Sequence, residues 1–236
     1  MENCNDETKL RETILNSLRE KAQVKQQIFD DTAEIFQQLK EALSEIADEL
    51  NEELGDIDKR VKLEYRDRGR YEAEIRVASD ILVFSMHTNV FQFDRGHMIW
   101  KTSQMQKNEL NSYCSMINIY NFLTDSFRYN RVDDLGYLVG RIFINKDGHY
   151  FVEGKRQMQF TCHNFGVDVI SKQTLKCIAG TAIHYALNFD LLVPPYDMAK
   201  IVSVGQINNK IEDSRIQTGK RLGFQFNADD VVNQKK

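Results

Sequence analysis

The sequence predicts an α+β fold in which a long N-terminal amphipathic helix precedes an antiparallel β-sheet of hairpins, with helices packed mainly on one face. Two observations predict it. Residues 1–57 are acidic and almost free of aromatic residues, as a surface helix is. Residues 61–162 have the pattern of short strands and carry sixteen of the 24 Phe, Tyr and Trp residues. The chain therefore divides into a helical, coiled-coil-like segment (1–57), an α+β domain (58–204) and a polar tail (205–236) that is either mobile or docked.

The N-terminal helix combines two apolar patterns. Leu10, Ile14 and Leu18 recur every four residues, and from Phe29 onward the spacing becomes a heptad. The heptad seam consists of Phe36, Leu39, Leu43, Ile46 and Leu50. No glycine or proline interrupts it before Gly55, so a helix of this length would project beyond its own sheet. We expect the seam to pair with a second copy of the chain; packing wholly within the chain is the alternative.

Charge is unevenly distributed along the chain. Residues 1–57 contain fifteen acids and six bases, a net charge of −9, so the rest carries +5 of the overall −4. This asymmetry predicts an acidic element that folds onto a basic surface of the chain or of a neighbour. The simpler interpretation is a solvated, Glu-rich helix face.

The first hairpin is predicted around Asp67-Arg68-Gly69, where apolar and charged residues alternate on both sides. A three-residue loop ending at Gly69 would place Tyr65 opposite Tyr71. The second hairpin is predicted to pair Ile81–Phe93 with Met98–Thr102. This register would place Phe93 opposite Met98 and Phe91 opposite Trp100.

The rest of the domain has one ambiguous stretch and two clear elements. Residues 109–130 suit a strand at Ile117 and Ile119, but helical spacing of other apolar residues leads us to expect a helix. A third hairpin is predicted around Asn145-Lys146-Asp147-Gly148, with Gly136 and Gly140 marking a bulge or close backbone approach. A helix is predicted after a Ser171 cap, with one apolar face: Leu175, Ile178, Ala182, Tyr185, Ala186 and Phe189. Lys200–Val204 is a further candidate strand.

Length and composition indicate a globular protein. A chain of 236 residues with 42% apolar and 28% charged residues can bury a substantial core. No apolar run approaches the length of about eighteen residues that a membrane span requires, and the acidic N-terminus is unlike a secretory signal. The four cysteines lack CxxC spacing, which favours reduced thiols: Cys4, Cys114, Cys162 and Cys177. We therefore expect a soluble cytoplasmic protein.

No residue pattern indicates catalysis. The five histidines are far apart in the sequence without a metal-binding spacing, so we expect neither a metal nor a cofactor. Cys162 and His163 are adjacent, and neighbouring strand residues point to opposite faces, which favours a structural cysteine over a nucleophile.

Two groups of residues are candidate binding sites. One is basic: Arg66, Arg68 and Arg70 lie at the first hairpin tip, and Lys155 and Arg156 follow the third hairpin. Arginine suits phosphate or carboxylate partners, although charged hairpin tips also discourage edge-to-edge aggregation. The other is aromatic and comprises Phe91, Phe93 and Trp100, which either bind a ligand or peptide or belong to the core.

The order of these elements resembles that of secretion chaperones, in which a small α+β domain dimerises and binds a polypeptide segment. The resemblance rests on element order and implies a non-enzymatic adaptor or chaperone-like protein that self-associates and binds another protein or peptide. An enzyme or sensor for a small anionic ligand is the second hypothesis. Nucleic-acid binding is the third, and a sequence pI of about 5.8 argues against it.

Overall fold

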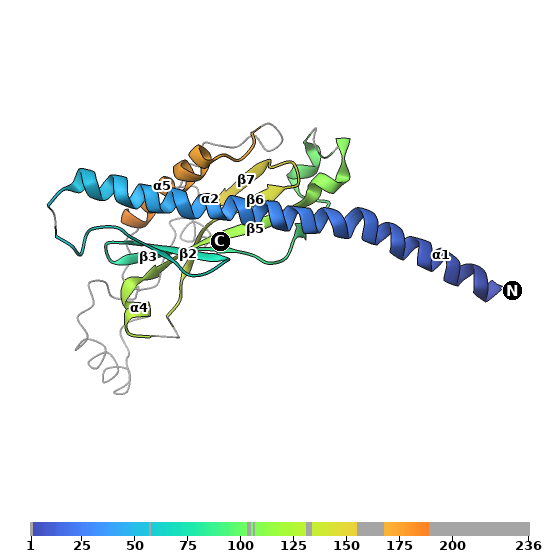
Figure 1. Ribbon diagram of the computed structural model, residues 1–236, viewed down its shortest axis with the longest axis horizontal. Coiled ribbons are helices and arrows are strands. Elements are labelled where there is room, and N and C mark those ends of the chain that lie inside the picture. Colours follow the sequence, from blue (N-terminus) through green and yellow to red (C-terminus); the bar gives the residue numbers. More distant parts are fainter. Residues whose placement is uncertain are drawn as a thin grey trace, which may run out of the picture.

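The computed structural model describes residues 2–56, 58–102, 105, 107–130, 134–154 and 168–188. The fold is α+β, as predicted: a long N-terminal helix precedes a seven-stranded antiparallel sheet, and further helices follow (Figure 1). The helices are α1 (Glu2–Ser17), a π-helical turn (Leu18–Ala22), α2 (Gln23–Leu54), the short α4 (Thr124–Arg128) and α5 (Lys172–Leu187). The strands are β1 (Glu64–Asp67), β2 (Glu72–Val77), β3 (Asp80–Met86), β4 (Phe91–Gln92), β5 (Tyr113–Leu123), β6 (Tyr137–Asn145) and β7 (Tyr150–Gly154).

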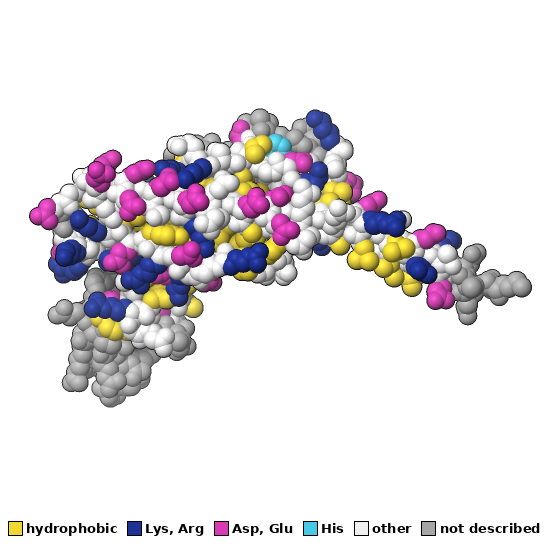
Figure 2. Space-filling model, in the orientation of Figure 1, with side chains coloured by type: hydrophobic (Ala, Val, Ile, Leu, Met, Phe, Trp, Pro, Cys, Tyr) yellow, Lys and Arg dark blue, Asp and Glu magenta, His cyan; other side chains and the backbone are white. Residues whose placement is uncertain are grey.

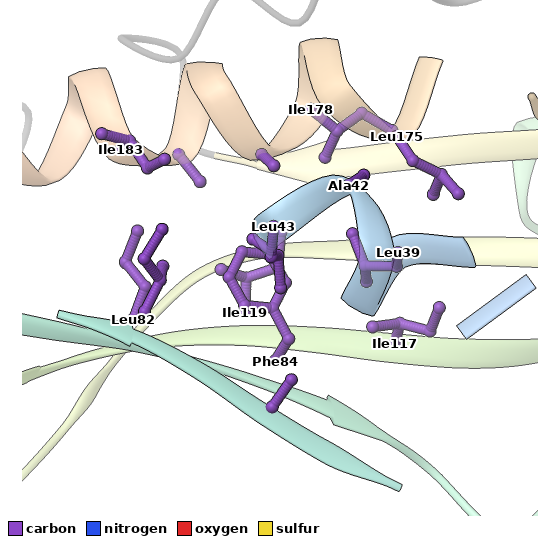
Figure 3. Packing of buried hydrophobic residues seen from close by; sticks show 14 of the residues in the cluster. Leu39, Ala42, Leu43, Leu82, Phe84, Ile117, Ile119, Leu175, Ile178 and Ile183 are labelled. Atoms are coloured by element: carbon purple, nitrogen blue, oxygen red, sulfur yellow. The ribbon is translucent and has the colours of Figure 1, made fainter. Parts of the chain in front are cut away.

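The sheet has the order β1-β2-β3-β5-β6-β7, and β4 pairs with the first two residues of β5. The helices α2 and α5 pack on the same face of it, so the prediction of helices mainly on one face is confirmed (Figure 1). Alternate strand residues meet these helices in one core, which includes Phe84 of β3, Ile117 and Ile119 of β5, and Leu175 and Ile178 of α5 (Figure 3). The opposite face of the sheet, which we call the outer face, carries the other alternate residues.

The first hairpin forms, but its predicted register is wrong. Tyr65 lies opposite Ile75 rather than Tyr71. The three-residue loop is shifted along the chain, so that it begins at Gly69 with φ +107° instead of ending there. Lys40 of α2 accounts for the shift, because its Nζ donates to Asp67 Oδ1 at 2.8 Å and to the Gly69 carbonyl at 2.6 Å. The loop moves by two residues, an even number, so the apolar side chains still point to the predicted face of the sheet.

The predicted second hairpin is also wrong. The hairpin partner of β3 is β2, and the two strands are joined through a two-residue turn in which Ala78 has φ +53°. The two turn residues, Ala78 and Ser79, include none of the glycine, asparagine or aspartate that usually marks a two-residue hairpin turn. Met98–Lys101 is a 3₁₀ helix rather than a strand, and His97 caps it by accepting a hydrogen bond from the Ile99 N–H.

The expected helix over 109–130 is wrong for most of its length. It is the central strand β5, which pairs with β3 on one side and β6 on the other. Ile117 and Ile119 enter the core, while the residues with apparent helical spacing divide between the outer face, the strand end and α4. Burial between two neighbouring strands therefore outweighs a coincidental helical period.

The later elements match their predictions. The third hairpin pairs Ile144 with Tyr150 around a left-handed Gly148 with φ +74°, and a bulge interrupts β6 opposite Ile119. The Ser171 side chain caps α5 by accepting from the Thr174 N–H. Several predicted features lie outside the described residues: Lys155, Arg156, Cys162, His163, Phe189, the strand Lys200–Val204 and the tail 205–236.

Candidate functional site

A group of large, exposed apolar side chains lies on the N-terminal part of the long helix. Residues 7–27, here called the N-terminal extension, are exposed throughout except for the half-buried Val24. Four large apolar side chains on it lie in solvent: Leu10 is 60% exposed, Ile14 50%, Leu15 39% and Leu18 57%. Figure 1 shows α1 projecting beyond the sheet, and Figure 2 shows apolar side chains gathered on its surface.

The extension continues directly into α2, which is fixed in the core. The π-helical turn Leu18–Ala22 joins α1 to α2 without a break in the helical backbone. Such a turn adds about one residue to the helical period, so it changes the direction in which α1 side chains point relative to α2. From Ile28 onward, which has no exposed surface, one face of the helix is covered by the body.

The heptad seam is used inside the chain, which corrects the expectation that it pairs with a second copy. Phe36, Leu39 and Leu43 have no exposed surface in the single chain, and Ile46 retains only 7%. They pack against the sheet and α5 in the main core (Figure 3). Only Leu50, at 36% exposed, remains accessible to a partner. The alternative of packing within the chain is therefore the one observed for the seam.

Acidic residues of α2 pair with lysines of α5. Lys172 Nζ lies 2.6 Å from a carboxylate oxygen of Glu45 and 3.3 Å from one of Glu41, and Lys176 lies 2.8 Å from both Glu45 and Glu49. Hydrogen bonds from the two lysines hold the pKa of Glu45 below its ordinary value. The same bonds raise the pKa of each lysine. Part of the N-terminal acidic charge is thus balanced within the chain.

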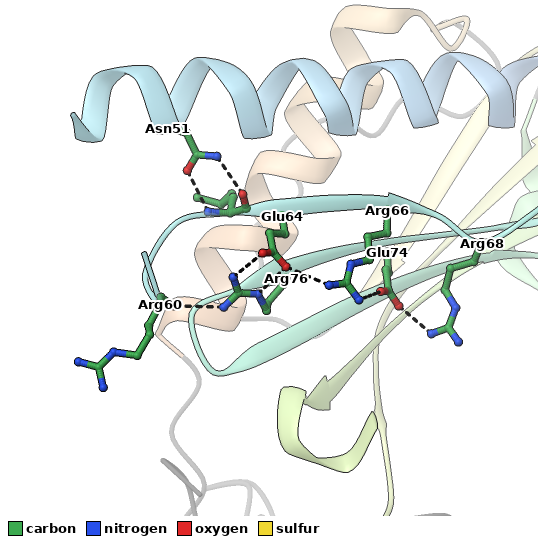
Figure 4. Close-up of polar contacts among 8 residues, drawn as sticks. Asn51, Arg60, Glu64, Arg66, Arg68, Glu74 and Arg76 are labelled. Atoms are coloured by element: carbon green, nitrogen blue, oxygen red, sulfur yellow. Dashed lines mark hydrogen bonds and ion pairs between the residues drawn. The ribbon is translucent and has the colours of Figure 1, made fainter. Parts of the chain in front are cut away.

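The arginines of the first hairpin belong to a lattice of ion pairs on the outer face (Figure 4). Arg68 lies 2.7 Å from the Glu74 carboxylate, whose side chain is only 7% exposed, and Arg66 lies between Glu74 and Glu64. Arg76 donates to Glu64, and this bond is the main cause of the lowered pKa of Glu64. An added anion would therefore compete with two carboxylates already in place.

The remaining predicted basic residues are not brought together with that lattice in the described structure. Arg70 is exposed, and its guanidinium lies 5.2 Å from the centre of the Tyr71 ring. Lys155 and Arg156 lie outside the described residues. The basic site expected from the sequence is thus represented by two paired arginines and one that stacks on an aromatic ring.

The predicted aromatic group is only partly brought together. Phe93 and Trp100 are neighbours, because the indole N–H lies 3.3 Å from the Phe93 carbonyl and donates to the Asp94 carbonyl at 2.8 Å. Phe91 is 38% exposed and packs edge-on against His87. The facing residues predicted across a hairpin are therefore not partners, since β4 pairs with β5 instead.

An aromatic cluster around Phe93 includes residues that the sequence analysis missed. The Phe93 ring stacks on His97 at 4.6 Å between centres and contacts Phe143 at 5.0 Å, and Phe143 stacks on Phe151. Phe143 and Phe151 are direct partners across the third hairpin. The correctly predicted turn at Asn145–Gly148 already implied this pairing, so the signal was present in the sequence.

A polar row also crosses the outer face and was missed. Consecutive register partners from β2 to β7 are Glu72, Ser85, Asn118, Arg141 and Glu153. Arg141 pairs with Glu153 at 2.5 Å, and its Nε is buried without a hydrogen-bond partner in the described part of the chain. Asn118 is 8% exposed. The row follows from the assignment of β5 as a strand, which the helical interpretation of 109–130 obscured.

Other reactive groups in the described residues are dispersed. Burial raises the pKa of the Cys114 thiol, whereas Cys177 lies exposed on α5. No group of three or more His, Cys, Asp or Glu side chains among the described residues is arranged to hold a metal ion. Within the same residues, no helix is both long and apolar enough to span a membrane.

Comparisons with known proteins give no relative for this chain: no family model matches it, and neither the curated proteins nor the solved structures contain a significant match.

Proposed function

We propose that this chain is a non-enzymatic, protein-binding protein of the cytoplasm, of the adaptor or chaperone-like kind, which self-associates through its N-terminal helix. The observation that carries the proposal is the exposure of Leu10, Ile14, Leu15 and Leu18 on a helix that projects from the body. Apolar side chains held together in water favour burial by a partner, at roughly 25 cal/mol for each Å² removed from water.

The anchoring of α2 supports a binding role for the extension. Besides its core contacts, α2 is fixed to the first hairpin by Lys40, which donates to Asp67. The Asn51 side chain fixes α2 to the residue before β1, because it both donates to the Leu63 carbonyl and accepts from the Leu63 N–H (Figure 4). The extension therefore projects from a rigid base. A helix presented in this way loses little conformational freedom when a partner packs on it, which favours binding.

The outer face supplies a second surface for the same role. The polar row offers carboxylates, a hydroxyl, an amide and a guanidinium. Beside it lies the aromatic cluster, made of Phe143 on β6, Phe151 on β7, and Phe93 and His97 from the segment after β4. Apolar rings next to convergent hydrogen-bonding groups suit an extended polypeptide segment. The exposed thiol of Cys177 and the buried thiol of Cys114 suit the reducing cytoplasm.

The two alternative functions have less support. An anionic small-molecule site needs basic groups available to the ligand, and Arg66 and Arg68 are already paired with Glu64 and Glu74. Nucleic-acid binding needs a basic surface, whereas the chain has a net charge of −4.

Native mass spectrometry of the gently purified full-length chain, without chelators, tests the proposal. A dimer or larger species with no additional mass is the expected result. A monomer that carries a bound small molecule would contradict self-association and favour the anionic-ligand hypothesis, and the mass would identify the ligand.

A further inference from the structure

We propose that the N-terminal extensions of two copies of this chain pair as antiparallel helices centred on Ile14. The inference rests on the proposed self-association and assigns it a surface and a direction. The extension contains 21 residues, which at 1.5 Å per residue gives a helix of about 30 Å, the length of about three heptads. That length is sufficient for a two-helix contact.

The apolar residues of the extension are symmetrically placed about Ile14. Leu10 precedes it by four residues and Leu18 follows it by four, so all three lie on neighbouring turns of one helix side. In an antiparallel pair centred on Ile14, Leu10 of each chain meets Leu18 of the other, and the two Ile14 side chains meet at the symmetry axis. The same patch on both chains is then self-complementary, as a two-fold interface requires.

Charge determines the direction of the pair. Glu7 lies seven residues before Ile14 and Lys21 lies seven residues after it, and both are exposed. An antiparallel pair therefore brings each Glu7 near the partner's Lys21. A parallel pair would bring Glu7 to Glu7 and Lys21 to Lys21, and like charges at such positions oppose association.

A second copy fits the extension better than a membrane surface does. Helices that lie in the bilayer interface bear aromatic residues and a long apolar face, whereas residues 7–27 contain no aromatic residue and only four large exposed apolar ones. Their polar side carries three acids and five bases, a mixture typical of helix pairs. The α1 part of the extension also projects beyond the sheet (Figure 1), and the described part of the body leaves Leu10, Ile14 and Leu18 exposed.

The arrangement has a functional consequence. Because the helices are antiparallel, the two bodies lie at opposite ends of the pair, and each presents its own outer face. Two binding surfaces held at a fixed separation raise the effective concentration for a partner that contacts both, and thereby its overall affinity.

Sedimentation velocity of the full-length chain over a range of concentrations tests the inference. Ile14→Asp should weaken the dimer roughly hundred-fold, because two apolar side chains leave the centre of the interface. Leu135→Asp is the matched control, since Leu135 is 75% exposed in the body and its replacement should leave the dimer unchanged. Circular dichroism should show an intact fold for both variants.

A charge exchange tests the direction. Glu7→Lys and Lys21→Glu should each weaken the dimer by roughly ten-fold, since each change turns two attractive pairs into repulsive ones. In an antiparallel pair the double variant should restore wild-type affinity. In a parallel pair each single variant would only exchange one like-charged pair for another, so neither would weaken the dimer. Failure of the double variant to recover would overturn the antiparallel arrangement.

The remaining outcomes separate this inference from the proposed function. A dimer that persists in Ile14→Asp overturns the extension as the interface but leaves self-association standing. A wild-type chain that is monomeric at its highest soluble concentration contradicts both. A monomer whose extension instead binds phosphatidylcholine–phosphatidylglycerol vesicles overturns the inference in favour of a membrane surface.

Discussion

Replacing Leu43 by alanine should lower the free energy of unfolding by about 2–5 kcal/mol, independently of protein concentration. Leu43 has no exposed surface in the single chain and belongs to the core cluster with Phe84 and Ile119 (Figure 3). The substitution removes three carbon atoms, worth about 2.4 kcal/mol at about 0.8 kcal/mol for each methylene. The cavity left between α2 and the sheet adds to this loss, because strands fixed in a sheet can close it only partly.

Guanidinium chloride unfolding, followed by circular dichroism at several protein concentrations, measures the effect. Leu18→Ala is the comparison, because Leu18 is 57% exposed in the single chain and its replacement should change the stability of the body by less than about 0.5 kcal/mol. A loss below about 1 kcal/mol for Leu43→Ala would refute the reasoning. So would a loss that appears only at concentrations where the chain is oligomeric, since the seam would then act between chains.

Three further predictions concern named contacts. Asp67→Asn should destabilise the protein more than Lys40→Met, as thermal unfolding would show, because it leaves the buried Lys40 charge without its carboxylate. Lys40 holds the pKa of Asp67 below its ordinary value of about 4, so the stabilisation is present above that pH and is lost as pH falls through the lower folded value. Wild type and Asp67→Asn should therefore converge in acid, because a protonated Asp67 also leaves Lys40 without a carboxylate. Gly136→Ala should lower the free energy of unfolding in chemical denaturation by about 1–3 kcal/mol, because its Cβ would lie 2.2 Å from the Phe122 ring of β5. Gly180→Ala in α5 is the comparison: its Cβ meets nothing within 4 Å, so it should raise the free energy of unfolding by about 0.5–1 kcal/mol.

The parts of the fold that could be predicted depend on short-range signals. The turn at Asn145–Gly148 contains a residue type suited to each of its backbone positions, and the Ser171 cap precedes a regular apolar helix face. Ala78 shows the opposite case, because it adopts a left-handed turn conformation that its residue type does not announce. The sequence analysis missed the β2–β3 hairpin for that reason. It therefore assigned Met98–Thr102, rather than β2, as the hairpin partner of β3.

The central strand β5 could not be assigned without its neighbours. Residues such as Met116 and Tyr120 suit either a helix or the outer face of a strand, and the sheet decides between them by burying Ile117 and Ile119. This error also hid the polar row, since Asn118 joins Ser85 to Arg141 only when β5 is a strand. The outer face thus depends on long-range pairing, which a local pattern does not contain.

The heptad pattern of the N-terminal helix was recognised correctly, but it does not specify what the helix packs against. An apolar seam is buried equally well by another helix or by the helix's own sheet, so Phe36 and Leu39 carry no information about the choice. The presence of a second apolar surface decides between them: the sheet and α5 provide one from Ile28 onward, whereas Leu10, Ile14, Leu15 and Leu18 remain exposed in the described chain. The residues with the weaker apolar pattern, Leu10 to Leu18, are therefore the ones left for a partner. Self-association is expected where the chain's own body ends rather than where the heptads are most regular.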